Sequence, residues 1–155
     1  MRIPFDATIP VVRRATGEWV ANLATWTWWV TLTFETPVSA DYAERSLRQW
    51  GQGIARHVAR AHVPIGYTRE WAGGSWHLHA LLAIPDDAAV NPRLLDERWK
   101  QLNRATGFTD IDRVNGSLPG AAYYLVKTNG WDFNVACHRP PRCRRTRCLE
   151  APSAW

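Results

Sequence analysis

The sequence predicts a single α+β domain in which an antiparallel sheet of about five strands packs against flanking helices. Short runs of β-branched and aromatic residues alternate with longer stretches in which apolar residues recur at intervals of three and four. A Gly-Gly pair joins two of the strand-like runs. The chain has 155 residues, of which 46% are hydrophobic, and this suffices for one sizeable core but not for two.

A strand is predicted over residues 26–34 and a helix over about 40–62. The strand alternates apolar residues with Thr31 and Thr33, so the two threonines share one face. Ser39 precedes the helix as a cap, and apolar residues recur through the helix at intervals of three and four. These two elements begin a β-α order.

Residues 64–71 and 76–84 form a predicted β-hairpin. The Ala-Gly-Gly-Ser quartet between them is a turn-forming segment. Whether the loop has two residues or four, symmetric pairing about the turn places Glu70 opposite His77. A bulge at the glycines would shift this register by one residue and turn Glu70 to the other face.

The rest of the chain supplies two more helices and two more strands. The predicted elements are a helix over about 92–106, a strand over 108–114, a helix over about 118–128 and a strand over 131–136. Asn91 and Pro92 are a typical helix start, and Gly107 is a typical helix end. The first six elements have the β-α-β-β-α-β order of a ferredoxin-like, split β-α-β sandwich. Because that fold serves many functions, the function has to be argued from a site.

The positive charge is concentrated near the C-terminal end. The net charge is +5, and residues 137–155 hold five arginines and one glutamate. We therefore divide the chain into an N-terminal extension (1–25), a folded domain (26–136) and a basic tail (137–155). A basic tail suits nucleic-acid phosphates, but a merely solvated end has the same composition. The candidate phosphate contacts are Arg142, Arg144 and Arg145.

The three cysteines, Cys137, Cys143 and Cys148, all lie in this tail. Their number is odd and their spacing lacks C-x2-C pairs, so reduced thiols are favoured over a disulfide framework or a zinc site that includes His138. The first residues lack the apolar run of a secretory signal, and no apolar stretch reaches the roughly 20 residues needed to cross a bilayer. We expect a cytoplasmic protein without a membrane partner.

The hairpin is predicted to bring three potential metal ligands onto one face. Side chains alternate along a strand, so His77 and His79 point to one side while Leu78 points to the other. Residues directly opposite each other share a face, so Glu70 joins the histidines. Two imidazoles and a carboxylate suit Mn²⁺, Mg²⁺, Zn²⁺ or Fe²⁺, and spacing does not distinguish among these metals. The alternative is a solvated hairpin face that binds no metal.

The predicted helix over 118–128 carries two adjacent tyrosines. Tyr123 and Tyr124 flank Lys127 on the side of the helix away from its aliphatic stripe. A phenol has a pKa of about 10 and needs a nearby cation to act as a nucleophile at neutral pH. Lys127 is within reach of either tyrosine. Ordinary packing of both rings against the sheet is the alternative, and this spacing does not separate the two tyrosines.

Three motifs together resemble the HUH endonuclease superfamily, in particular the single-tyrosine replication initiator (Rep) proteins of plasmids and small DNA viruses. Residues 31–34 (TLTF) are similar to the first motif of that family, residues 77–79 (HLH) to its metal motif and residues 124–127 (YLVK) to its nucleophile motif. The motifs occur in the family's order, on the predicted elements of residues 26–136.

The resemblance implies an enzyme that nicks and joins single-stranded DNA through a 5′-phosphotyrosine, as in rolling-circle replication of a plasmid or phage. The implied ligands of Mn²⁺ or Mg²⁺ are Glu70, His77 and His79. Tyr124 is the implied nucleophile because Lys127 follows it by three residues, and Tyr123 is the alternative nucleophile. Thr31 and Thr33 are expected to line the DNA strand.

This interpretation carries expectations about the DNA substrate and a protein partner, and it has two alternatives. The substrate is an origin hairpin or nick site, and a host helicase is the expected partner for strand unwinding. A transposase or relaxase of the same superfamily would use the same chemistry. A non-catalytic nucleic-acid-binding module with a ferredoxin-like sheet is the alternative of a different class.

Overall fold

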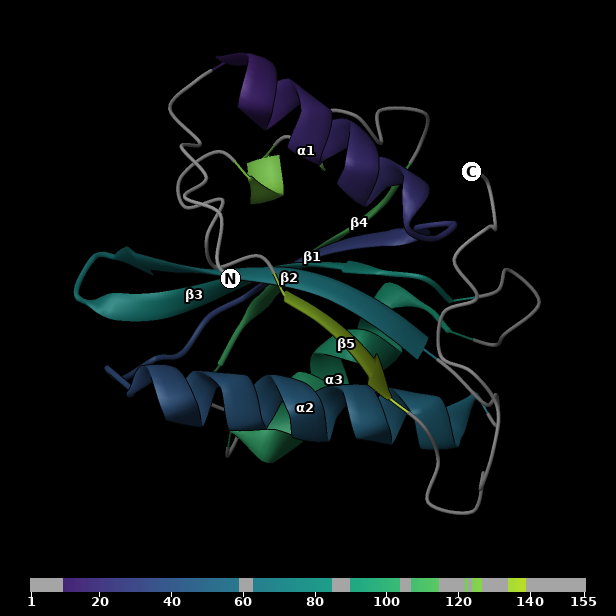
Figure 1. Ribbon diagram of the computed structural model, residues 1–155. Coiled ribbons are helices and arrows are strands. Elements are labelled where there is room, and N and C mark those ends of the chain that lie inside the picture. The colour runs from purple at the N-terminus through teal and green to yellow at the C-terminus, as the bar shows by residue number, and fades with distance from the viewer. Residues whose placement is uncertain are drawn as a thin grey trace.

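Figure 1 shows the computed structural model of the chain, in which helices cover both faces of an antiparallel sheet. The structure describes residues 10–58, 63–84, 90–103, 107–114, 122, 124–126 and 134–138. The predicted α+β class and antiparallel sheet are confirmed. In this described part of the chain, no helix has the length and apolar character needed to cross a membrane.

After one additional helix, the observed elements follow the predicted order as far as the strand predicted over 108–114. They are α1 (Pro10–Asn22), β1 (Trp28–Leu32), α2 (Ala40–His57), β2 (Val63–Ala72), β3 (Ser75–Leu82), α3 (Pro92–Leu102), β4 (Thr109–Arg113) and β5 (Asn134–His138). The strand order is β4-β1-β3-β2-β5, and every neighbouring pair is antiparallel. β3 therefore lies in the middle of the sheet, between β1 and β2.

The helix α1 lies in the segment that the sequence analysis assigned to an N-terminal extension. It begins at Pro10, a residue that suits the first turn of a helix, and it buries Gly17 and Val20. Figure 1 shows α1 above the sheet and α2 and α3 below it. Since α1 buries only these two residues, its apolar positions do not form a continuous stripe, and sequence periodicity did not predict it.

The helix α3 ends earlier than predicted. Asn103 caps it after Leu102, with its backbone N–H donating to the Trp99 carbonyl at 3.1 Å. Gly107, the predicted helix end, has another role, because a Cβ there would lie 2.6 Å from Trp99 Nε1 and 2.8 Å from the Thr33 carbonyl oxygen. The glycine permits the close packing in which Trp99 Nε1 donates to that carbonyl at 3.0 Å.

Other boundaries also differ from the predicted ones. β1 covers only the middle of 26–34, and α2 ends at His57. β5 runs to His138 and thus enters the segment assigned to the tail. Of the helix predicted over 118–128, residues 122, 124 and 125 are helical, and most of the others lie outside the described residues.

The register of the β2–β3 hairpin is the predicted one. Glu70 pairs with His77, and Thr68 pairs with His79. Gly73 and Gly74 have φ angles of 60° and 82°, the positive values that a type I′ turn requires at both central positions. Glycine adopts these angles without steric cost, so the two-residue turn fixes the pairing without a bulge.

The sheet separates two clusters of buried apolar side chains. The larger cluster lies between the sheet and the helices α2 and α3 and includes Leu78 and Trp99. The smaller cluster includes Leu81 of β3, Val20 of α1 and Leu125. Alternate residues of β3 therefore enter different clusters, and the odd-numbered residues face the smaller one.

The packing of Gly107 leads to a stability prediction. Gly107→Ala is expected to lower the free energy of unfolding by about 1–3 kcal/mol, because the added Cβ would clash with Trp99 and the Thr33 carbonyl. Gly53→Ala is the matched control, since its Cβ would come no closer than 3.6 Å to Arg98 and alanine suits a helix interior better than glycine. Urea unfolding measures both variants. Unchanged stability in Gly107→Ala would contradict the close contact.

Candidate active site

A row of polar side chains crosses the face of the sheet that carries the smaller apolar cluster. Cross-strand pairing places Asp110 of β4 beside Thr31 of β1, and Thr31 beside His79 of β3. His79 in turn pairs with Thr68 of β2. Residues directly opposite each other share a face, and Leu81, the next residue of β3 on this face, belongs to the smaller cluster. The row thus borders an apolar region.

The imidazole of His79 is held from both sides. The residue is 8% exposed. Its Nε2 lies 2.9 Å from Glu70 Oε2, and its Nδ1 lies 3.1 Å from Thr31 Oγ1. Because a carboxylate only accepts hydrogen bonds, Nε2 carries the proton of the neutral ring, and Nδ1 accepts the proton of the Thr31 hydroxyl. The ring is therefore fixed in position and tautomer by groups from β1 and β2.

Burial lowers the pKa of His79 from its ordinary value of 6.5. The hydrogen bond and the negative charge of Glu70 act in the opposite direction, and His77 lowers the pKa slightly further. The net direction keeps the imidazole neutral at pH 7, which is the form that binds metal ions.

Two aromatic rings pack against this imidazole. Trp29 stacks on His79 with a centroid distance of 5.8 Å and an interplanar angle of 13°. Tyr124 meets both rings edge-on, at 5.1 Å from His79 and 5.4 Å from Trp29. Its neighbours Ala122 and Leu125 are buried in the smaller cluster, while Tyr124 itself is 41% exposed. The buried neighbours thus anchor Tyr124 beside His79 and leave part of it open to solvent.

His77 lies on the same face but does not join the Glu70–His79 pair. Its Nε2 lies 3.1 Å from the carbonyl oxygen of Ala72, close to the hairpin turn. Among the residues that the structure describes, no group of three or more His, Cys, Asp or Glu side chains is arranged to hold a metal ion. Of the three predicted ligands, two are in contact and the third is nearby.

The Glu70–His79 pair fits two adjacent positions around a metal ion. Ligand bonds of about 2.1 Å at right angles place neighbouring donor atoms about 3 Å apart. The observed separation of Nε2 and Oε2 is 2.9 Å, which also suits a direct hydrogen bond. The hydroxyl of Thr68, opposite His79, is buried and has no hydrogen-bond partner within the described residues. Buried polar groups are normally hydrogen-bonded, so the Thr68 hydroxyl is available to bond to a group that binds at this site.

The remaining predicted site residues divide into two groups. Thr33 is buried, and its hydroxyl donates to the Phe108 carbonyl at 2.9 Å, a placement that connects β1 to the start of β4 and does not favour a DNA contact. The residues that lie outside the described part of the chain are Tyr123, Lys127, Arg142, Arg144 and Arg145.

Trp29 is the site residue that the sequence analysis missed. The alternation of β1 contained the signal, because burial of Trp28 in the larger cluster turns Trp29 to the opposite face, beside Thr31. With ten tryptophans in the chain, composition did not single this one out.

The assembled site contains a neutral imidazole, a carboxylate and a phenol on one face of the sheet. This set of groups can bind a divalent cation and place a nucleophilic oxygen nearby. No protein-family model, curated protein or solved structure matches the chain.

The site predicts how His79 titrates. In metal-free protein, NMR titration should give His79 a pKa below 6.5. Because folding lowers this pKa, the contribution of His79 to the free energy of unfolding is present above pH 6.5 and decreases as the pH falls from there toward the folded-state pKa.

A carboxylate variant tests the cause of this shift. Glu70→Gln should lower the pKa of His79 further, because it removes the charge that favours the imidazolium. Glu97→Gln on α3 is the control and should leave the His79 titration unchanged, since α3 lies on the other side of the sheet. A rise of the His79 pKa in Glu70→Gln would contradict the contact between the two side chains.

Proposed function

We propose that this chain is a metal-dependent HUH endonuclease that nicks and joins single-stranded DNA through a 5′-phosphotyrosine. The observation that carries the proposal is the contact of Tyr124 with His79, at a centroid distance of 5.1 Å. Tyr124 and His79 belong to motifs that are far apart in the sequence, and their side chains meet on one sheet face. The position of β3 between β1 and β2 also supports a ferredoxin-like, split β-α-β sandwich.

The proposed ligands of Mn²⁺ or Mg²⁺ are Glu70, His77 and His79. A bound metal would polarise a non-bridging oxygen of the scissile phosphate. His77 would give up its contact with Ala72 to complete the ligand set. With Nε2 of His79 as ligand, Nδ1 would carry the ring proton and donate it to Thr31, the kind of bond that fixes the orientation of a ligating histidine.

Tyr124 is the proposed nucleophile. Its phenol oxygen forms a bond to phosphorus while the bond from phosphorus to the 3′-oxygen breaks; the phenol loses its proton, and the 3′-oxygen gains one. The product is a 5′-phosphotyrosine beside a free 3′-hydroxyl. The phosphoester is conserved, so attack by a 3′-hydroxyl reverses the step and rejoins the strand. Lys127 would stabilise the phenolate, and Trp29 would hold the ring against His79.

This chemistry suits the initiation of rolling-circle replication of a plasmid or phage in the cytoplasm, with a host helicase to unwind the duplex. Transposition and conjugative transfer would use the same step on a different DNA site. Beyond the scissile phosphate, the DNA contacts that we propose are the tail arginines Arg142, Arg144 and Arg145.

A non-catalytic nucleic-acid-binding module is the second candidate. Its support is that both ring nitrogens of His79 have partners within the protein, and that His77 is paired with the backbone of Ala72. In such a module the polar row would be structural, and the exposed part of Tyr124 would stack on a base. Covalent chemistry distinguishes the two candidates.

The first functional prediction concerns the covalent adduct. With Mn²⁺ and single-stranded origin-like hairpin oligonucleotides, a denaturing gel should show a protein–DNA adduct, and EDTA should abolish it. Tyr124→Phe keeps the ring contacts but lacks the nucleophilic oxygen, so no adduct should form. Tyr42→Phe, at an exposed tyrosine of α2, is the matched control and should form the adduct normally. An adduct in Tyr124→Phe would contradict the assignment, and no adduct in wild-type protein would favour the second candidate.

The second functional prediction concerns metal affinity. Thr31→Val removes the partner of His79 Nδ1 and should weaken Mn²⁺ binding about 10- to 100-fold, as measured by titration calorimetry. Thr33→Val is the matched control, since its hydroxyl bonds to the Phe108 carbonyl and its loss should affect stability but not metal affinity. Equal Mn²⁺ affinities of the two variants would contradict the proposed role of Thr31.

A further inference from the structure

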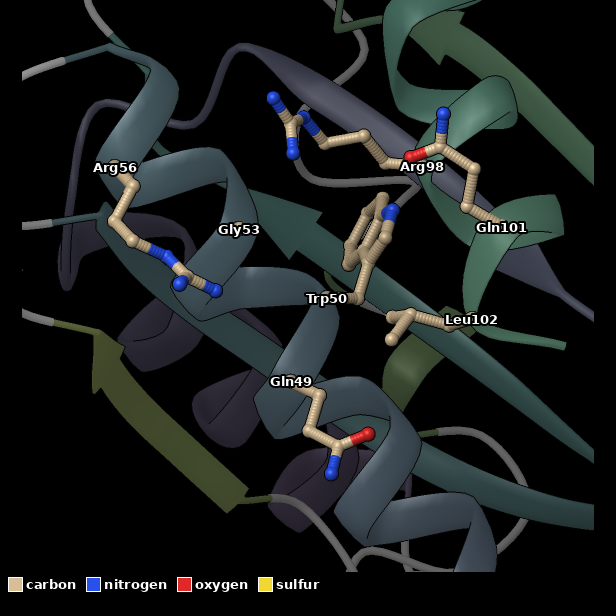
Figure 2. Close-up of a pocket in the computed structure, with 7 residues that line it drawn as sticks. All are labelled: Gln49, Trp50, Gly53, Arg56, Arg98, Gln101 and Leu102. Carbon is tan, nitrogen blue, oxygen red and sulfur yellow. The ribbon is translucent and has the colours of Figure 1, made fainter.

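A second polar site lies on the opposite side of the sheet. A cavity of about 150 Å³ opens between α2 and α3, the helices that cover the larger apolar cluster. Figure 2 shows Arg56 approaching it from α2 and Arg98 from α3. Two amide side chains, Gln49 and Gln101, complete its polar lining. His79 faces the other cluster, so this cavity is separate from the candidate active site.

Neither arginine in the cavity has a carboxylate partner within the described residues. Arg56 donates through Nε to the backbone carbonyl of Gln52 at 3.2 Å. The Nε of Arg98 is buried and has no hydrogen-bond partner in that part of the chain. On the exposed side of α3, by contrast, Arg93 pairs with Glu97 at 2.7 Å. Two guanidinium groups that have no carboxylate partner among the described residues therefore line one concave site.

Trp50 and Gly53 of α2 line the cavity next to the two arginines. Trp50 is fully buried, and its indole N–H donates to the Leu95 carbonyl at 3.0 Å, so the ring is fixed. Gly53 lies in the interior of α2, where glycine costs about 1 kcal/mol relative to alanine. A Cβ at this position would contact the Arg98 side chain at 3.6 Å. A larger residue at position 53 would occupy the space that Arg98 now borders.

We propose that the cavity between α2 and α3 binds a phosphate group. The planar guanidinium groups of Arg56 and Arg98 offer N–H donors in the geometry that phosphate oxygens accept, and the glutamine amides add neutral donors. Phosphate brings the negative charge that this pair of arginines lacks among the described residues. The phosphate group belongs either to the backbone of DNA that passes along α2 and α3 or to a small phosphorylated molecule. The site is independent of the proposed nicking chemistry.

Titration of the full chain with inorganic phosphate tests the proposal. The backbone amides of Gly53 and Gln101 should show saturable NMR shifts. Arg98→Gln should weaken phosphate binding about tenfold or more, because it removes a charge-assisted contact. Gly53→Leu should weaken it to a similar extent by filling the cavity while both arginines remain. Arg93→Gln, which removes the same charge from the exposed face of α3, should bind phosphate as wild type does.

A parallel titration with duplex DNA identifies the source of the phosphate. If Arg98→Gln and Gly53→Leu lose DNA affinity relative to Arg93→Gln, the phosphate belongs to the DNA backbone. If they lose inorganic phosphate but keep DNA affinity, the ligand is a small phosphorylated molecule. The proposal is overturned if phosphate produces no saturable shift, or if Arg93→Gln weakens phosphate binding as much as Arg98→Gln does.

Discussion

The two-residue turn at Gly73 and Gly74 is the constraint on which the site depends. Its positive φ angles set the pairing of β2 with β3, and the pairing places Glu70 on the face of His77 and His79. A shift of one residue would move the carboxylate to the opposite face and leave His79 without its 2.9 Å partner. The proposed active site therefore depends on the backbone conformation of these two glycines.

The second constraint is the place of β3 in the middle of the sheet. Its even-numbered residues, such as Leu78, belong to the larger cluster between the sheet and the helices α2 and α3, while Leu81 belongs to the smaller one. His79 lies between these stabilising contacts on a strand with neighbours on both sides. Burying an imidazole is unfavourable unless it is hydrogen-bonded, and Glu70 and Thr31 satisfy both nitrogens. The packing that stabilises the central strand thus also holds His79, the proposed metal ligand, in position.

Sequence patterns predicted the features that depend on interactions between residues close together in the sequence. Turn chemistry and strand alternation predicted the pairing of Glu70 with His77 and the orientation of Leu78 away from the histidines, and both are confirmed. The helix α1 was missed because it is stabilised by a few tertiary contacts and not by its own periodicity. The meeting of Trp29 with Tyr124 was also beyond prediction, since it depends on how a distant helix packs on the sheet. The contact of the His77 side chain with the Ala72 carbonyl also could not be predicted, because no sequence pattern determines the rotamer of His77.

Anomalous diffraction from crystals grown with Mn²⁺ tests the central claim most directly. A metal centre at this site should give one strong peak on the sheet face, about 2.0–2.3 Å from Nε2 of His79 and from Glu70 Oε2, with His77 turned away from Ala72 to become the third ligand. If Glu70 and His79 remain hydrogen-bonded to each other at saturating Mn²⁺ and no peak lies between them, the site is a structural network and not a metal centre.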